Sequence, residues 1–328
     1  MKAAWFNRFG SPAESLEVGQ YAKPEVGHGD VLVRVHASGV NPSDVKKRAG
    51  AFPNLLDTGS VIPHSDGAGI IEAVGRGVPK SRIGERVWVY QAQYGRMEGT
   101  AAEYVALPSE RAPTLPDTTS FAEGACMGIP AMTAHRCVFA DGSVQGQTVL
   151  VTGGAGRVGH YAIQWAKHAG ATVIATASNP EAEQHAYDAG ADAVINHRAE
   201  DFADQVKAAN GGQAVDRVVE VEFGANLANA LKVLKIGGVI ATYSSTVVPE
   251  PTLPFRDMMF QDITLRMVIV YAMPEQAKQD AIEDINWYLA ENKLQHRIAH
   301  TVPLEEVAKS HELIEEAGFY GCVVVEVE

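Results

Sequence analysis

The stretch Thr-Val-Leu-Val-Thr-Gly-Gly-Ala-Gly-Arg-Val-Gly, residues 148–159, decides the fold of this chain. Residues 148–152 form a short apolar run rich in β-branched side chains, which is typical of a buried strand. Gly154, Gly156 and Gly159 then match the pattern G-x-G-x-x-G, and residues 157–169 have the apolar spacing of a helix. A strand that turns through such glycines into a helix is the phosphate-binding turn of a dinucleotide site.

The glycines of this turn have a chemical purpose. A pyrophosphate must come close to backbone N–H groups at the helix N-terminus, and a side chain there would block the approach. The alternative, a glycine-rich turn that binds nothing, is disfavoured because a regular series of strands and helices follows. The predicted cofactor contacts in the loop are Gly154, Ala155, Gly156, Arg157, Val158 and Gly159.

Strands and helices alternate regularly after the loop. The predicted strands lie at residues 172–177, 193–196, 216–221 and 239–243, and the predicted helices at 180–189, 199–209 and 225–234. Apolar strands joined by helices at this spacing indicate a parallel sheet covered on both faces. The predicted fold is therefore α/β, with a doubly wound Rossmann sheet.

The two ends of the chain have a different pattern. Before residue 120, short strand-like runs are broken by Gly and Pro, which predicts a mostly β, barrel-like domain. Ser120 and Glu123 form a capping box that opens a helix reaching about residue 139. After residue 262 we expect a strand at 263–271, helices at 275–291 and 304–317, and a strand at 322–327. These patterns predict a dinucleotide-binding domain, 123–262, inserted into a domain made of 1–122 and 263–328.

Composition excludes several classes of function. The 328 residues carry 27 Lys and Arg against 40 Asp and Glu, and a net charge of −13 disfavours binding to nucleic acid or anionic membranes. No apolar run is long enough to span a bilayer, and the N-terminus lacks the apolar core of a secretory signal. The three cysteines are far apart, so neither disulfides nor a zinc knuckle are expected, and a reducing cytoplasm is the predicted location.

The end of the second strand bears on cofactor choice. A site that prefers NAD usually has Asp or Glu here to hold the ribose hydroxyls, whereas this chain has Ser178 and Asn179. Either residue could cap the helix that Pro180 begins, which leaves a positive helix end for a 2′-phosphate. This pattern favours NADPH, although Glu181 and Glu183 follow closely.

The cation that a 2′-phosphate needs is not obvious in the sequence. No Lys or Arg lies between residues 175 and 188. His197 and Arg198, after the third strand, could supply it, or could belong to a solvated loop. Ser244, directly after the strand 239–243, completes the predicted cofactor-binding residues.

The order of motifs resembles a known family. The motifs are Gly-Val-Asn-Pro-Ser-Asp at 39–44, Ser-Asp-Gly-Ala-Gly at 65–69, the segments 99–104 and 153–159, and Val-Ile-Asn-His-Arg at 194–198. Over essentially its whole length the chain resembles the quinone oxidoreductase (zeta-crystallin-like) branch of the medium-chain dehydrogenase/reductase superfamily. The resemblance implies a Rossmann domain inserted into a GroES-like domain, a nicotinamide cofactor and a small-molecule substrate.

The resemblance also bears on metal binding. Relatives with catalytic zinc have Cys, His and Cys where this chain has Asn41, Ser65 and Ile129, none of which is an ordinary zinc ligand. Their four-Cys structural lobe, expected near residues 90–103, is absent. No metal site is predicted, and His64 is interpreted as a structural histidine rather than a ligand.

The substrate site is predicted from the same resemblance. Asn41 would line the pocket and donate to a quinone oxygen, and Asp44 would anchor neighbouring groups; a plain Asn-Pro turn capped by Asp44 is the alternative. Thr133 would lie near the nicotinamide carboxamide, or be a helix hydroxyl bonded to its own backbone. Many members of the family have aromatic hydroxyls where this chain has Lys46 and Phe52, so Lys46 is either a proton donor or solvated.

The predicted activity is NADPH-dependent reduction of a quinone without zinc. The changes at Lys46 and Phe52 keep open a reductase of enones or other activated double bonds, and a non-catalytic nucleotide-binding protein is the alternative of another class. The strand 263–271 has strong β propensity and one charge, Arg266, so we expect a homodimer paired along it. A strand buried within one chain is the alternative.

Overall fold

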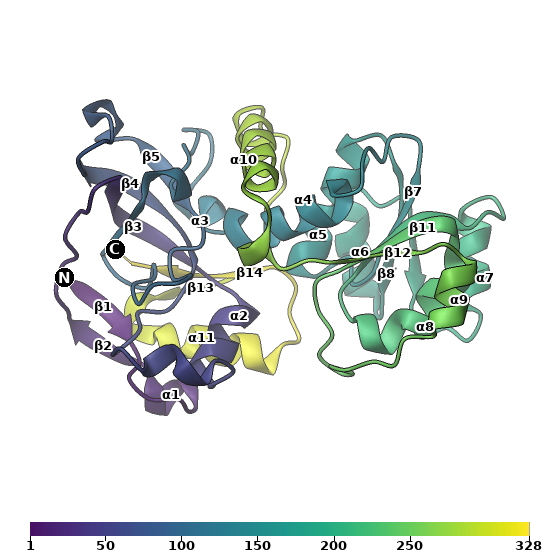
Figure 1. The fold of residues 1–328 in the computed structure, drawn as a ribbon, viewed down its shortest axis with the longest axis horizontal. Helices are drawn as coiled ribbons and strands as arrows, with labels where there is room; N and C mark the ends of the chain where they lie inside the picture. The colour runs from purple at the N-terminus through teal and green to yellow at the C-terminus, as the bar shows by residue number, and fades with distance from the viewer. Residues whose placement is uncertain (328) are drawn as a thin grey trace. The chain divides into compact units, whose positions relative to one another are not determined.

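The computed structural model describes residues 1–327, which divide into two compact units. Unit 1 comprises Met1–Ile129 and Ile282–Glu328, and unit 2 comprises Pro130–Ala281. Figure 1 shows both units along the chain. The sequence placed the second boundary at residue 262, but the structure places it at Ala281, because the strand after residue 262 joins the parallel sheet of unit 2.

Unit 2 is built on one six-stranded parallel sheet in the order β12-β11-β10-β7-β8-β9. This is the strand order of the Rossmann fold, and it reverses between β7 and β10. The strands are β7 (Thr148–Val151), β8 (Thr172–Ala177), β9 (Ala193–Asn196), β10 (Val215–Glu220), β11 (Leu234–Thr242) and β12 (Thr264–Met267).

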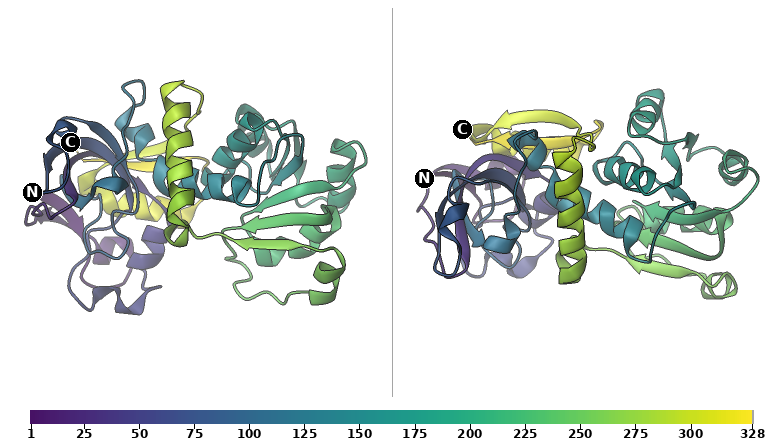
Figure 2. Two further views of the ribbon diagram at one scale, coloured as in Figure 1. Left: turned by 45° about the horizontal axis from the view of Figure 1, so that its top comes forward. Right: turned by 90° about the horizontal axis from the view of Figure 1, so that it is seen from above.

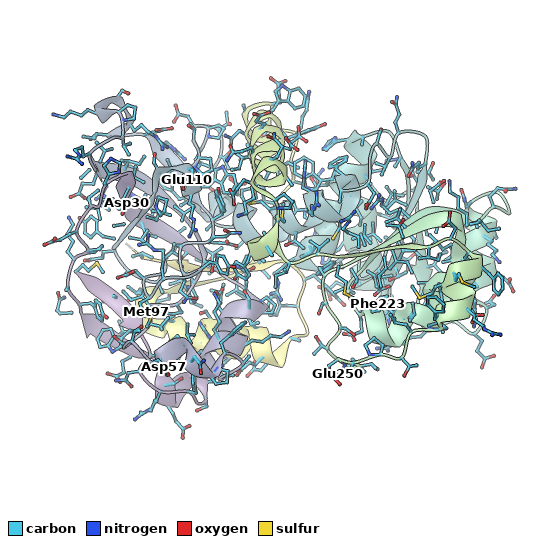
Figure 3. The ribbon with its side chains drawn as sticks, viewed as in Figure 1. Asp30, Asp57, Met97, Glu110, Phe223 and Glu250 are labelled. Atoms are coloured by element: carbon cyan, nitrogen blue, oxygen red, sulfur yellow. The ribbon has the colours of Figure 1, made fainter. Side chains whose placement is uncertain are left out.

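The helices of unit 2 cover both faces of this sheet (Figure 2). Strand side chains alternate between faces, so Leu150, Val218 and Ile240 form one core with α7 and α8. On the other face α5 packs with α4 and α6. The helices are α4 (Met132–Phe139), α5 (Arg157–His168), α6 (Pro180–Asp188), α7 (Phe202–Ala209), α8 (Phe223–Val233) and α9 (Phe255–Phe260). Figure 3 labels Phe223, where α8 begins, and Glu250, in the loop before α9.

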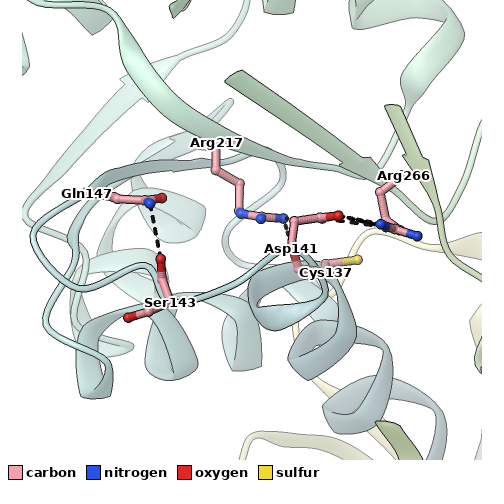
Figure 4. A network of polar contacts seen from close by, with 6 residues as sticks. All are labelled: Cys137, Asp141, Ser143, Gln147, Arg217 and Arg266. Atoms are coloured by element: carbon pink, nitrogen blue, oxygen red, sulfur yellow. Dashed lines mark hydrogen bonds and ion pairs between the residues drawn. The ribbon is translucent and has the colours of Figure 1, made fainter. Parts of the chain in front are cut away.

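An ion-pair network ties the edge strand β12 to α4 (Figure 4). Asp141, just after α4, accepts from Arg217 of β10 at 3.2 Å and from Arg266 Nε of β12 at 3.2 Å. Arg217 is only 2% exposed and also donates to the Cys137 carbonyl at 2.8 Å. A buried guanidinium needs a charged partner, so Asp141 is expected to stabilise unit 2.

Unit 1 contains a six-stranded sheet in which β13-β14-β3-β4-β5 are neighbours and β6 pairs with β3. The long strand β3 pairs with β4 along one edge, and along its other edge it pairs first with β6 and then with β14, around one apolar core. A separate pair, β1–β2, completes it. The strands are β1 (Lys2–Trp5), β2 (Glu17–Gln20), β3 (Asp30–Val40), β4 (Asp66–Val74), β5 (Arg86–Val89), β6 (Tyr104–Pro108), β13 (Ile298–Pro303) and β14 (Cys322–Glu326).

Two helices matter for the site in unit 1. The helix α2 (Pro42–Arg48) begins directly after β3, with Asn41 as its N-cap residue. The helix α3 (Phe121–Gly124) begins at the predicted capping box, in which Glu123 N donates to Ser120 Oγ at 3.2 Å. Further helices are α1 (Pro12–Ser15), α11 (Val307–Glu316) and α10 (Glu275–Ala290), which crosses the boundary between the units.

Two predicted elements differ from the structure. The helix expected from residue 120 to 139 is broken into α3, the π-helical turn η4 (Met127–Ala131) and α4, because Pro130 cannot donate its backbone nitrogen. The strand expected over 263–271 is only β12, and a 3-10 turn follows at Val270–Ala272. No helix within residues 1–327 is long and apolar enough to cross a membrane.

Candidate active site

The glycine loop adopts the geometry that a phosphate-binding turn needs. Gly153 has a φ of +62°, which favours glycine, and its N–H donates to Thr176 Oγ1 at 2.9 Å. Gly154 and Gly159 are buried, and a Cβ on Gly154 would lie 2.8 Å from that of Ala175. A Cβ on Gly159 would collide with the Gly153 carbonyl. These two glycines therefore let α5 pack closely on the sheet.

Gly156 has a different role. It is exposed, it is the N-cap of the twelve-residue helix α5, and no side chain caps that helix. The single neighbour of a Cβ built here would be the Gly153 oxygen at 3.1 Å, so the space beside it is open. Open space at an uncapped helix N-terminus fits the pyrophosphate of a dinucleotide. The other predicted residues of the loop, Ala155, Arg157 and Val158, lie beside it in the same turn.

A hollow of about 240 Å³ lies at the carboxyl ends of β8 and β9. Ser178 and Asn179 line it, and Asn179 Oδ1 also accepts from Ala182 N at 2.9 Å, which confirms it as the cap of α6. Glu183 is the one charged residue in its lining. His197 and Arg198 follow β9 and are exposed, but neither lines this hollow.

A second hollow, of about 340 Å³, lies at the carboxyl ends of β11 and β12. Its lining includes the predicted residue Ser244 together with Thr242, Val268 and Ile269. The glycine loop lies at the end of β7, between these two hollows in the strand order. Ligands of open parallel sheets bind at the carboxyl ends of the strands, so this edge can hold an extended dinucleotide.

In unit 1, two carboxyls hold Asn41. Its backbone N–H donates to Asp44 Oδ2 at 2.9 Å, and its side-chain amide donates to Asp66 Oδ2 at 2.9 Å. The same Asp66 oxygen accepts from Ile129 N at 2.7 Å. Asn41 is 3% exposed, and both carboxyls are buried. Asp44 thus caps α2 as the N3 residue of a capping box, which is the alternative that the sequence left open, and one amide N–H of Asn41 is already used.

Burial dominates the acid–base properties of these carboxyls. It raises the pKa of Asp44 to about 6, and the nearby Lys47 ammonium partly opposes the shift. Burial also raises the pKa of Asp66, against the hydrogen bond from Ile129 N. Asp66 Oδ1 has no hydrogen-bond partner, and a Cβ on Gly128 would collide with it. Gly128 is therefore required beside this carboxyl.

The two adjacent lysines of α2 have different surroundings. Lys46, the predicted proton donor, is exposed, as is Phe52. Lys47 is 7% exposed, and its Nζ donates to Gln93 Oε1 at 2.5 Å. Burial lowers the pKa of Lys47, while Asp44 and Asp66 act to raise it. Sequence reasoning missed Lys47, although its position three residues after Asp44 places both on one helix face.

His64 belongs to a buried hydrogen-bond chain. Its Nδ1 lies 2.8 Å from Ser38 Oγ and its Nε2 lies 3.0 Å from His311 Nε2, and Ser38 also contacts Thr100 Oγ1 at 2.7 Å. Burial lowers the pKa of His64 to about 3. These contacts confirm the structural interpretation of His64.

Thr133 belongs to unit 2, while Asn41, Asp44 and Lys46 belong to unit 1. It is buried within α4 at 4% exposure. Asp66 is a further residue that sequence reasoning did not assign to the site. It lies in the Ser-Asp-Gly-Ala-Gly motif, so the motif was the available signal.

Comparisons with known proteins agree along the whole chain. The family model described as alcohol dehydrogenase GroES-like domain matches residues 27–117, and the one described as zinc-binding dehydrogenase matches 158–287. Human quinone oxidoreductase is 31% identical over 99% of this chain and 97% of that protein. The chain belongs to the quinone oxidoreductase branch of the medium-chain dehydrogenase/reductase superfamily.

Solved structures support this family fold. A mycobacterial quinone oxidoreductase is 27% identical, covers all of both chains and superposes with a TM-score of 0.88. A mycobacterial protein complexed with NADPH is 26% identical at the same TM-score, again with both chains fully covered. An alcohol dehydrogenase of Geobacillus stearothermophilus is 28% identical over the full length of both. The chain is thus an oxidoreductase of this superfamily with a nicotinamide-binding fold.

The donor set of this chain does not fit the zinc ion of other superfamily members. At two of the expected ligand positions this chain has Asn41 and Ile129, which offer neither a thiolate nor an imidazole, and an N–H of each donates to the same Asp66 oxygen. Within residues 1–327, no group of three His, Cys, Asp or Glu side chains is arranged to hold a metal. The carboxyl of Asp66 joins the segments of Asn41 and Ile129 by these two hydrogen bonds.

Proposed function

We propose that this protein is an NADPH-dependent, zinc-independent reductase that delivers hydride to a quinone. The observation that carries the proposal is the open, uncapped helix end at Gly156, flanked by hollows at the carboxyl ends of β8–β9 and β11–β12. The quinone oxidoreductases to which the chain is similar support the reaction class.

The cofactor would extend along the edge of the unit 2 sheet. The pyrophosphate would bind the loop at Gly156, and the adenosine ribose would lie in the hollow beside Ser178 and Asn179. The nicotinamide end would occupy the hollow that includes Ser244, where it supplies the hydride. Thr133 is proposed to contact its carboxamide.

The preference for NADPH rests on the end of β8. No acid there holds the ribose hydroxyls, and the N-terminus of α6 beside the hollow favours a phosphate. His197 and Arg198 are the proposed cations for the 2′-phosphate. Glu183 acts in the opposite direction, because its charge lines the same hollow. The similar mycobacterial protein complexed with NADPH adds support.

The proposed acceptor follows from the chemistry of the Asn41 site. Without a Lewis acid, hydride transfer favours acceptors that delocalise the arriving negative charge, as quinones and enones do. The amide of Asn41 has a second N–H beyond the one given to Asp66, and this one could donate to the acceptor oxygen. The carboxyls of Asp44 and Asp66 fix the position of that donor.

Initial rates with NADPH and NADH against a panel of quinones and enones test the proposal. We expect faster turnover of quinones with NADPH. Faster turnover of enones would favour the second candidate, which the replacement of aromatic hydroxyls by Lys46 and Phe52 keeps open. If the protein binds NADPH but no acceptor oxidises the bound NADPH, the alternative of a non-catalytic nucleotide-binding protein is favoured. One zinc per chain by elemental analysis, with activity lost to a chelator, would contradict zinc independence.

A homodimer is also proposed, paired through the edge of the unit 2 sheet. Within residues 1–327 the outer side of β12 has no partner strand, and Met267 and Ile269, which also line the hollow at the ends of β11 and β12, are 67% and 59% exposed. An apolar sheet edge of this kind is commonly covered by a second copy. Val268 is not a suitable probe, because its N–H donates to Thr242 O inside the chain at 2.7 Å.

A further inference from the structure

Lys47 is the buried cation of the Asn41 site. Asp44, Lys47 and Arg48 share one face of α2 and are all buried, whereas Lys46 is exposed. A lysine ammonium is seldom buried unless opposite charges and hydrogen bonds replace its lost hydration. The structure must therefore contain groups that stabilise the buried ammonium of Lys47, whereas the neighbouring Lys46 remains in solvent.

The partners of Lys47 are the groups that hold Asn41. Its Nζ donates to Gln93 Oε1, and Gln93 Nε2 in turn donates to the Arg96 carbonyl at 2.9 Å. A neutral amide does not balance a charge. The carboxyls of Asp44 and Asp66 do, since each interacts electrostatically with the Lys47 ammonium.

We propose that Lys47 is a positioning residue for Asn41: its buried ammonium keeps Asp44, three residues earlier on the same face of α2, as the hydrogen-bond acceptor that holds the Asn41 backbone N–H. The meaning of this for catalysis rests on the proposed function. Lys47 does not itself contact the acceptor. It acts through the Asp44 carboxyl.

The physical reason is the balance of charge in a closed space. Without the Lys47 ammonium, the buried Asp44 carboxylate would take up a proton at higher pH, because burial raises its pKa and Lys47 opposes that shift. A protonated carboxyl accepts hydrogen bonds more weakly and gains an O–H donor. Asp44 Oδ1 and Asp66 Oδ1 have no partner that could accept from such a donor. The hold on Asn41 would therefore loosen when Lys47 loses its charge.

Other titratable groups face this cluster from neighbouring elements. His64, in the segment before β4, interacts with Lys47, and its burial keeps it neutral at ordinary pH. Cys126, which follows α3, and Cys322, at the start of β14, face Asp66 and hydrogen bond with each other. Burial and this contact raise the pKa of Cys126, so the thiols add no positive charge. Lys47 is thus the cation that lowers the pKa of Asp44 against the effect of burial.

The experiment compares Lys47→Met with Lys80→Met, which removes an exposed lysine of unit 1 outside the site. The titration of Asp44 is followed by NMR in the free protein with ¹³C-labelled Asp carboxyls, and Asp44→Asn assigns its signal. In Lys47→Met the midpoint of this titration should rise above about 6, the pKa of Asp44 in the unmodified protein. It should not move in Lys80→Met. Quinone kcat/KM should fall by up to about 100-fold in Lys47→Met alone, since small displacements of a reacting group have effects of that size. NADPH affinity should be unchanged in both.

A milder variant guards against misfolding. Gln93→Leu removes the hydrogen bond to Nζ but no charge, and should shift the Asp44 titration and kcat/KM in the same directions by less. An Asp44 titration that is equal in wild type and Lys47→Met would overturn the proposal, as would a shifted titration with unchanged kcat/KM. If the wild type reduces no acceptor, the proposed function fails, and the titration still decides whether Lys47 controls the Asp44 carboxyl.

Discussion

In the His64→Asn variant, the free energy of unfolding should fall less steeply with decreasing pH than in the wild type. His64 has a φ of +76°, a backbone conformation that Asn tolerates better than most residues, so the substitution adds little strain. Its ring is completely buried between Ser38 and His311. The variant therefore removes one buried, titratable ring while keeping the backbone.

The magnitude follows from the pKa of His64. In the unfolded chain the pKa is near 6.5, and in the folded protein burial lowers it to about 3. Between these values the unfolded state binds a proton that the folded state does not, so the free energy of unfolding falls as pH falls. Each pH unit corresponds to about 1.4 kcal/mol, so His64 accounts for about 5 kcal/mol between pH 6.5 and pH 3.

Other buried groups also act as the pH falls, and they include the carboxyls of Asp66 and Glu220, whose raised pKa values have the same sign as that of Asp44. The pKa of His311 is also lowered by burial, so it adds to the loss. Asp44 has the opposite sign: its pKa is raised to about 6, so the folded state binds a proton first and gains stability as pH falls toward 3.8. Comparing wild type with His64→Asn largely cancels the contribution of Asp44.

The assay is urea unfolding at several pH values between 7 and 4, followed by tryptophan fluorescence. At pH 7 the variant should be less stable, because Ser38 and His311 lose a hydrogen-bond partner. Its free energy of unfolding should then fall more slowly with acidification, by up to about 1.4 kcal/mol per pH unit. Parallel curves for the two proteins would show that His64 is not the group that titrates, and would refute the reasoning.

Four further predictions concern the cofactor, the core of unit 2 and the oligomer. Gly156→Val should abolish NADPH binding without changing the circular dichroism spectrum, because the valine side chain would fill the space proposed for the pyrophosphate. Gly10→Ala is the control, and unchanged NADPH affinity in Gly156→Val would exclude this loop as the phosphate site. Glu183→Lys should raise the ratio of kcat/KM with NADPH to kcat/KM with NADH by roughly fivefold or more for each unit of charge changed, because two charges 4 Å apart in water interact by about 1 kcal/mol. An unchanged ratio in steady-state kinetics would contradict this prediction. Asp141→Asn should destabilise the protein by about 3 kcal/mol in thermal or urea unfolding, because Arg217 stays buried without a counter-charge, and a loss below 0.5 kcal/mol would show that other groups stabilise it. Ile269→Glu should convert a dimer to monomers in light scattering, and a wild type that is monomeric at micromolar concentration would disprove the dimer.

Local signals in the sequence were enough to predict the elements that depend on a few neighbouring residues. The glycine loop, the capping box of Ser120 and Glu123 and the cap of α6 by Asn179 all lie where they were expected. Each involves residues at most five positions apart, so spacing alone defines it. The alternation of strand and helix likewise predicted the parallel sheet, because a crossover helix must join parallel neighbours.

Contacts between distant residues were decided only by the tertiary structure. Asp66 binds Asn41 from 25 positions away and Ile129 from 63, and no local pattern encodes such distances. Two adjacent lysines read alike in the sequence, but helical geometry turns only Lys47 toward Gln93 and the carboxyls. The strand predicted over 263–271 ends at Met267, because strand length is set by pairing with β11 rather than by β propensity alone.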